Sequence, residues 1–152
     1  MNNTHQKCLY LDVCTLCRPF DDQNMMRIRI ETDGYYLILQ ALKNQKYKMI
    51  VSPVHLEEVG AISDLTEMNE VLAVLKKFGV KAVCDLAKTK MRATYLHSKK
   101  FGVADAAHVA FAEATSDFFI TCDDKLIKKS KKEKVMVRVM NPVEFCIIED
   151  LK

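Results

Sequence analysis

Short apolar runs alternate along this chain with longer segments of helical periodicity, and this alternation constrains the fold more than any other feature. The short runs are almost continuously apolar, as in strands that are buried on both faces of a sheet. We expect strands at residues 8–13, 48–53, 117–124 and 134–140, helices at residues 24–43, 54–62, 66–78, 80–98 and 103–115, and a capped terminal helix or short strand at residues 141–151. This order predicts an α/β, three-layer sandwich in which helices cover both faces of a mainly parallel sheet of about four to five strands.

The length and composition are typical of one globular domain. The chain has 152 residues, of which 49% are hydrophobic and 28% are charged. This is enough for one core and too little for two ordinary domains, so we expect a single domain over residues 1–152. The apolar runs are too short to cross a membrane, and the first residues lack the basic start and apolar stretch of a secretory signal. We therefore expect a cytoplasmic protein with no membrane association.

Acidic residues stand where such a sheet would bring them to one edge. Asp12 ends the first apolar run in "YLDVCTL", Glu58 lies in the helix of "SPVHLEEV", Asp105 opens the helix "ADAAHVAFA", and Asp123 follows the third strand in "FITCDD", with Asp124 beside it. Each of them alone fits a structural role as a helix cap, a dipole partner or part of a solvated helix face. Right-handed crossovers, however, place the carboxyl ends of parallel strands on the same edge, so we expect one shared acidic pocket.

Such a pocket has a definite chemistry. Converging carboxylates repel one another and raise each other's pKa unless a cation lies between them. Hard oxygen ligands select Mg²⁺ or Mn²⁺ rather than zinc, and we expect Asp12, Asp105, Asp123 and Asp124 to bind the metal. A metal of this kind polarises a phosphoryl oxygen and lowers the pKa of a bound water, so the expected substrate is a phosphodiester.

The order of the acidic residues on an alternating β/α frame resembles the PIN domain, the fold of the VapC-like toxin ribonucleases. The resemblance covers essentially the whole chain, and its most specific part is the pair formed by "ADAAHVAFA" and Thr121-Cys122-Asp123. It implies a magnesium- or manganese-dependent endoribonuclease with Asp12, Glu58, Asp105 and Asp123 as catalytic residues. It also implies an RNA substrate, an antitoxin partner and a homodimer.

One position departs from the family pattern. Cys14 stands where PIN domains usually carry Ser, Thr or Asn, so a polar group that would orient Asp12 or a metal-bound water is missing. Thr15 is the nearest substitute, and we expect it to contact the substrate. The departure bears on catalytic efficiency more than on the fold.

A lysine-rich segment follows the fourth acidic position. Although the net charge of the chain is only +3, six lysines lie between positions 125 and 134. A run of this kind is usually a solvated helix end, but beside an acidic pocket it can hold phosphates. We expect Lys125, Lys128 and Lys129 to bind the RNA backbone.

Two other functions compete with this hypothesis. A haloacid dehalogenase-type phosphotransferase also starts with a strand and Asp, but it needs a second acid two positions later, where this chain has Cys14. A PIN-fold RNA-binding module with weak or no catalysis is the stronger alternative, because Cys14 departs from the pattern.

The cysteines and histidines carry less information. Cys14 and Cys17 form a C-x-x-C motif, but no second ligand pair follows, so we expect unpaired thiols rather than a zinc site or a disulfide. His108 lies one turn after Asp105, where a hydrogen-bonded, half-buried role is favoured over contact with substrate. His55 suggests only packing or a surface position.

Overall fold

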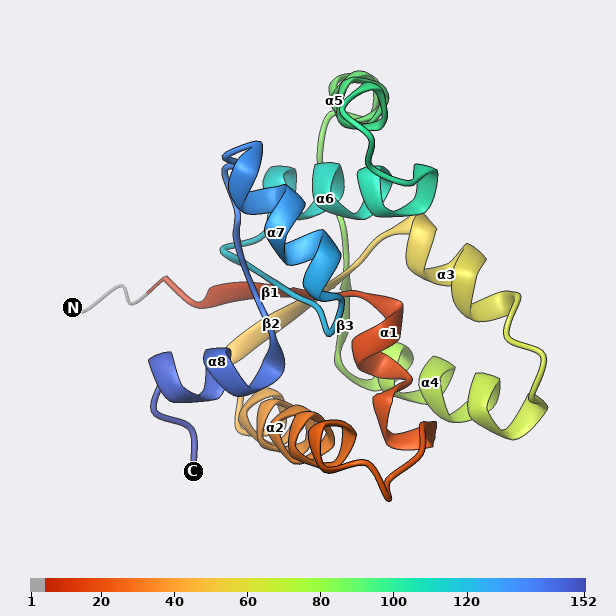
Figure 1. Cartoon of the computed structure of the whole chain (residues 1–152), viewed down its shortest axis with the longest axis vertical. Helices are drawn as coiled ribbons and strands as arrows, with labels where there is room; N and C mark the ends of the chain where they lie inside the picture. The colour runs from red at the N-terminus through yellow and green to blue at the C-terminus, as the bar shows by residue number, and fades with distance from the viewer. Residues whose placement is uncertain (1–4) are drawn as a thin grey trace.

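A five-stranded parallel sheet lies at the centre of the molecule in the part of the chain that the computed structural model describes, residues 5–152 (Figure 1). The strands are β1 (Lys7–Leu11), β2 (Tyr47–Val51), β3 (Gly79–Lys81), β4 (Phe118–Ile120) and β5 (Arg138–Met140). Their spatial order is β3-β2-β1-β4-β5, and every neighbouring pair is parallel. The first strand is therefore central. The chain adds strands on one side of β1 as far as β3 and then crosses to the other side with β4, so the switch point lies between β1 and β4. Open α/β sheets bind their ligands at such a switch point.

Helices cover both faces of the sheet (Figure 1). They are α1 (Val13–Leu16), the 3₁₀ helix η1 (Arg18–Phe20), α2 (Met26–Lys43), α3 (Pro53–Gly60), α4 (Leu65–Phe78), α5 (Leu86–Ser98), α6 (Val103–Thr115), α7 (Asp124–Lys132) and α8 (Pro142–Ile148). One apolar core joins the sheet to α2, α4 and α8, and a second core joins its other face to α5, α6 and α7. The three-layer α/β sandwich expected from the sequence is confirmed.

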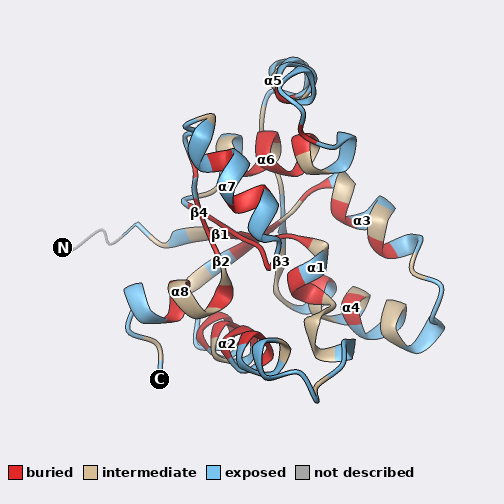
Figure 2. Ribbon diagram, in the orientation of Figure 1, coloured by how far each residue is buried: buried red, intermediate tan, exposed pale blue. Residues whose placement is uncertain are grey.

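Strand β1 shows how the two cores form. Leu9 and Leu11 belong to the core with α2, while Tyr10 belongs to the core with α6, because successive side chains of a strand point to opposite faces. All three side chains are fully buried, and Figure 2 shows the buried residues concentrated in the strands and the inner sides of the helices. The continuous apolar run in the sequence is the consequence of this two-sided burial.

The prediction of one helix over residues 80–98 is wrong. Residues 79–81 form the edge strand β3, and the helix α5 begins only at Leu86, capped by Asp85. A side chain at Gly79 would collide with the carbonyl oxygen of Leu75 and with Val51, so only glycine allows the chain to pass here from α4 into the sheet. The C-terminal segment, for which helix and strand were both open, is the helix α8, capped by Asn141.

Within residues 5–152, no helix is both long enough and apolar enough to cross a membrane.

Candidate active site

The parallel pairing of β1 and β4 brings two of the predicted acidic residues to the same edge of the sheet. Leu11 pairs with Ile120, and the next residue along β1, Asp12, donates its backbone N–H to the Ile120 carbonyl at 3.1 Å. Asp12 then caps α1, and Asp123 caps α7 by accepting from the N–H groups of Lys125 and Leu126 at 3.0 and 3.2 Å. Asp12 and Asp123 thus cap helices and also lie at the carboxyl edge of the sheet.

Asp12 is held by an unusually complete set of donors. It is only 5% exposed, and its carboxylate accepts from the Thr15 N–H and hydroxyl at 3.1 and 2.9 Å and from the Thr121 hydroxyl at 2.5 Å. Burial raises the pKa of Asp12, and these hydrogen bonds act against that rise because they favour the charged form. Thr121 also accepts from the N–H of Asp123 at 3.1 Å, so one hydroxyl fixes both acidic residues.

The departure at Cys14 leaves a donor in place. The Cys14 thiol contacts both oxygens of Asp12, at 3.0 and 3.1 Å, while Thr15 supplies a hydroxyl. Thr15 is fully buried, and its hydroxyl also reaches the Ile120 carbonyl. Its observed contacts are therefore within the protein, and its direct contact with a substrate stays a prediction.

Asp105, in the first turn of α6, lies close enough to Asp12 and Asp123 for their charges to change its pKa. It is half-buried, and loss of hydration raises its pKa first. The charges of Asp123 and Asp12 raise the pKa further, and Glu58 adds a smaller effect in the same direction. The structure thus brings Asp12, Asp123 and Glu58 within electrostatic reach of Asp105.

Glu58, rather than its neighbour Glu57, faces the buried side of α3. Its Oε1 accepts from Nε2 of His108 at 2.7 Å, whereas Glu57 is exposed. The hydrogen bond from His108 lowers the pKa of Glu58. Glu58 is therefore held as a carboxylate at neutral pH, only partly open to solvent.

A buried chain of hydrogen bonds behind Glu58 was not found from the sequence. His108 contacts the Tyr10 hydroxyl at 2.6 Å, Tyr10 contacts the Ser52 hydroxyl at 2.7 Å, and the Ser52 N–H donates to His55. These residues come from α6, β1, the end of β2 and α3. The interpretation of His55 as mere packing is incomplete, because both of its ring nitrogens are hydrogen-bonded. In the sequence, the one indication of this chain was Tyr10, because a hydroxyl group in the middle of a buried strand needs a hydrogen-bond partner.

Asp124 lies in a different electrostatic environment. Its carboxylate forms a bidentate ion pair with Arg27 of α2, at 2.6 and 2.7 Å, which lowers its pKa. Arg27 also approaches the buried Glu31 at 3.4 Å. Metal binding by Asp124 would have to compete with this arginine.

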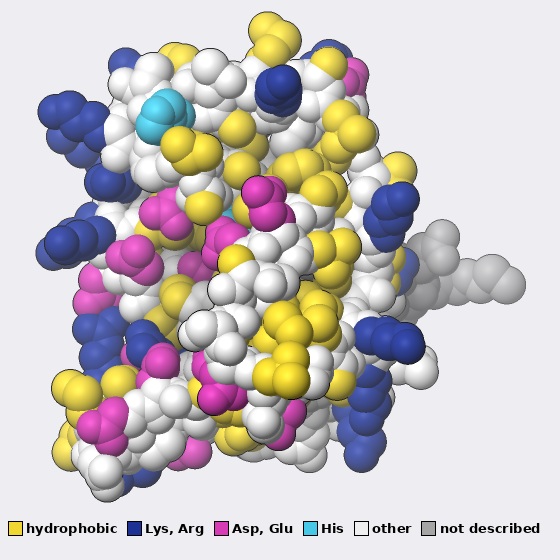
Figure 3. All heavy atoms as spheres, turned by 90° about the vertical axis from the view of Figure 1, so that its right-hand side faces the viewer, with side chains coloured by type: hydrophobic (Ala, Val, Ile, Leu, Met, Phe, Trp, Pro, Cys, Tyr) yellow, Lys and Arg dark blue, Asp and Glu magenta, His cyan; other side chains and the backbone are white. Residues whose placement is uncertain are grey.

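The lysines predicted to bind RNA are exposed on α7. The ammonium group of Lys129 donates to the Lys100 carbonyl at 2.8 Å, while Lys125 and Lys128 extend from the first turns of the same helix. Figure 3 shows several Asp and Glu side chains close together near the middle of this face, with Lys and Arg side chains mostly towards its margins.

The donor set fits a hydrated hard cation better than a tightly caged one. Within residues 5–152, no group of three or more His, Cys, Asp and Glu side chains is arranged to hold a metal ion directly. Burial raises the pKa of Asp105 most, and the charges of Asp123 and Asp12 raise it further, so these three carboxylates act on one another electrostatically. Mg²⁺ keeps several of its waters in proteins, so such carboxylates can bind it partly through water.

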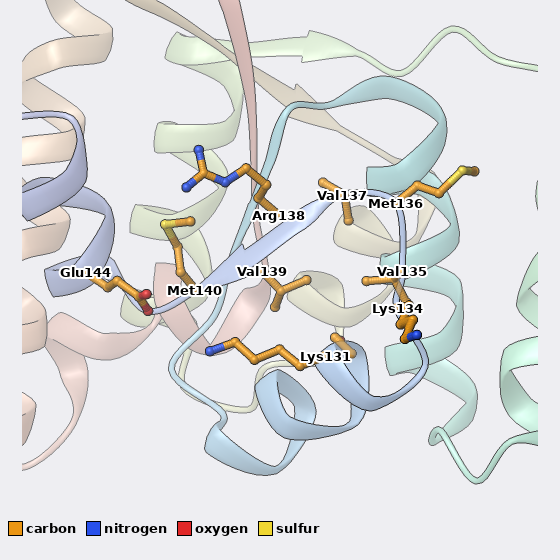
Figure 4. Close-up of a pocket in the computed structure, with 10 residues that line it drawn as sticks. Lys131, Lys134, Val135, Met136, Val137, Arg138, Val139, Met140 and Glu144 are labelled. Carbon is orange, nitrogen blue, oxygen red and sulfur yellow. The ribbon is translucent and has the colours of Figure 1, made fainter.

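A separate groove lies beside β5 and the end of α7 (Figure 4). Its volume is about 380 Å³, and Lys131, Lys134, Arg138 and Glu144 contribute its charged side chains. None of the four predicted catalytic residues lines it. The groove is therefore distinct from the acidic site.

Comparison with known proteins supports the fold. No family model and no curated protein matches the sequence. Among solved structures, FitAcB from Neisseria gonorrhoeae has 19% identity and a TM-score of 0.55, covering 88% of this chain and 97% of that one. VapBC2 from Rickettsia felis bound to a promoter DNA fragment has 16% identity and a TM-score of 0.54, covering 88% and 97%. The predicted PIN-like fold is thereby confirmed.

Proposed function

We propose that this protein is a metal-dependent endoribonuclease that hydrolyses RNA phosphodiester bonds and acts as the toxin of a toxin–antitoxin pair. The observation that carries the proposal is the acidic site itself. Asp12 and Asp123 follow the neighbouring strands β1 and β4 beside the switch point, their charges and that of Glu58 act on Asp105, and Glu58 accepts a hydrogen bond from His108. The likeness to FitAcB and VapBC2 supports a protein partner of the antitoxin kind, and we extend the proposal to a homodimer in the cytoplasm.

In this proposal each group has a defined task. Asp12, Asp105 and Asp123 would hold Mg²⁺ or Mn²⁺, with Asp124 joining them only if it leaves Arg27. When bound, the metal supplies Lewis acidity at the phosphoryl group and a more acidic water. Glu58 would orient and accept a proton from the attacking water, and the lysines of α7 would hold the RNA backbone through its phosphates.

A second candidate function is an RNA-binding module on the same fold with little or no catalysis. It is favoured by the finding that, among the described residues, no three ligands are arranged to hold a metal directly. Such a module would bind RNA through the same lysines.

Cleavage and binding measured separately distinguish the two functions. We expect the wild-type protein to cut a fluorophore-labelled single-stranded RNA of mixed sequence with Mg²⁺ or Mn²⁺ and to stop when EDTA is added. Asp12→Asn should reduce cutting at least ~100-fold, since it removes a metal ligand, while RNA binding is retained. Asp33→Asn is the matched control, because Asp33 is an exposed acid on α2. Equal cutting by wild type and Asp12→Asn would contradict the nuclease proposal, whereas binding without cutting by the wild type would favour the module.

A further inference from the structure

The hydrogen bonds that lead from the interior to Glu58 form a continuous chain, and the roles of some of its nitrogens are fixed by their partners. His55 faces the Leu11 carbonyl with Nε2, at 2.6 Å, so this nitrogen donates. Its other nitrogen, Nδ1, faces the Ser52 N–H at 3.0 Å and therefore accepts. His55 is thus neutral, with its proton on Nε2. Burial lowers the pKa of His55 to about 4, which agrees with this assignment.

The same reasoning assigns Nε2 of the second imidazole. Nε2 of His108 faces a carboxylate oxygen of Glu58 at 2.7 Å, and an ionised carboxylate can only accept, so Nε2 donates. Its Nδ1 lies 2.6 Å from the Tyr10 hydroxyl, which in turn lies 2.7 Å from the hydroxyl of Ser52. A continuous chain of hydrogen bonds therefore links Ser52 through Tyr10 and His108 to Glu58.

The residues of this chain are fixed by their surroundings. Tyr10, Ser52, His55 and His108 are each at most 2% exposed. The rings of Tyr10 and His55 lie 4.4 Å apart, and those of His55 and His108 lie 5.2 Å apart. The chain ends at a carboxylate that is still 34% exposed, so the rigid part of the molecule reaches solvent at Glu58.

We propose that His108 is a positioning residue: its Nε2–H group fixes one oxygen of Glu58 and so aims the other oxygen, Oε2, at the acidic site. Oε2 receives no hydrogen bond from residues 5–152 and is free to contact water. An unsupported glutamate side chain would sample several rotamers, and only some of them would reach the space shared with Asp105. This inference rests on the proposed function, because it assigns a task within that reaction.

The test compares two substitutions at one position. His108→Leu removes the donor, whereas His108→Gln retains an N–H group at a similar reach. With the labelled RNA and Mn²⁺, we expect His108→Leu to lower kcat about 10- to 100-fold with less than about a 3-fold change in KM, as when a residue supporting a catalytic group is lost. His108→Gln should recover most of the loss. Val109→Ala, at a fully buried neighbour on α6, controls for destabilisation of the helix.

A structural measurement does not depend on cleavage. Long-range ¹H–¹⁵N NMR spectra of the wild-type protein should show both His55 and His108 as Nε2–H tautomers, and Glu58→Gln should shift the His108 signals but not those of the exposed His97. A proton on Nδ1 of neutral His108 would overturn the inference. So would a His108→Leu variant that cuts as fast as Val109→Ala. Absence of cutting by the wild type contradicts the proposed function instead, and with it the task assigned to His108.

Discussion

Single residues at the carboxyl edge serve the fold and the candidate site together. Asp12 caps α1 while Thr15 and Thr121 hold its carboxylate. The contacts with Thr15 follow from local sequence, because a strand, an Asp and a hydroxyl residue three positions on form a cap, whereas Thr121 is brought to Asp12 by the pairing of β1 with β4. The residues of the acidic site could therefore be chosen from the sequence. The buried chain from Ser52 to His108 could not, because it joins four elements that are far apart in the sequence.

The buried His55 should make stability depend on pH. Its pKa is lowered from 6.5 to about 4 in the folded protein, so the unfolded chain takes up a proton first as the pH falls. The stabilisation from neutral His55 is complete above pH 6.5 and is lost towards pH 4, which amounts to about 3 kcal/mol. Urea unfolding of the wild type between pH 7 and pH 4 should therefore show a steeper loss than His55→Gln.

Two points make the comparison specific. The raised pKa values of Asp12 and Asp105 act in the opposite direction, but they are present in both proteins and cancel in the difference. His97→Gln, at an exposed histidine, should keep the wild-type slope. Parallel curves for the wild type and His55→Gln would show that His55 does not titrate as described.

At the level of elements, periodicity predicted most of the architecture. The helices α2 and α6 lie close to their expected positions because each repeats its apolar residues on one face. The strand β3 was missed because it has only three residues, two of them exposed, and therefore lacks an apolar run. Its place in the sheet depends on the close approach at Gly79, which is a tertiary contact rather than a local pattern.

Helix α7 should provide the salt-dependent part of RNA binding. Its Lys125 and Lys128 are exposed beside the capping residue Asp123, and contacts to phosphates release counterions. In an Asp12→Asn background, which prevents cutting, Lys125→Ala with Lys128→Ala should weaken binding of single-stranded RNA. The slope of log K against log salt should fall by about 0.7 for each lysine. Fluorescence anisotropy at several salt concentrations measures both quantities.

The control pair is Lys76→Ala with Lys77→Ala. These lysines lie in the last turn of α4, which leads into the amino end of β3 and so lies at the edge of the sheet opposite the acidic site. They carry the same charge, so a purely global effect of charge would weaken binding equally in both pairs. Equal weakening would therefore contradict a binding role for α7.

For the whole molecule, the acidic site is a region where folding brings like charges together. Burial and mutual repulsion raise the pKa of Asp105, and burial raises that of Asp12. Because both shifts are upward, ionised carboxylates at neutral pH reduce the stability of the metal-free protein. A cation that binds only the folded protein offsets this cost and adds its own binding free energy.

The effects of Mn²⁺ and of Asp12→Asn on the melting temperature should therefore show whether the cation binds at the acidic site. At about 100 times its dissociation constant, Mn²⁺ should stabilise the wild type by about 2.7 kcal/mol. A chain of this size gains about 2–4 °C in Tm for each kcal/mol, so we expect a rise of roughly 5–10 °C.

Asp12→Asn should have a higher Tm than the wild type without metal, because one repelling charge is gone, and should lose most of the shift with Mn²⁺. Asp33→Asn, an equal change of charge on the exposed side of α2, should keep the full shift. If Mn²⁺ raised the Tm of Asp12→Asn as much as that of the wild type, the cation would bind elsewhere, and the acidic edge of the sheet would not be its site.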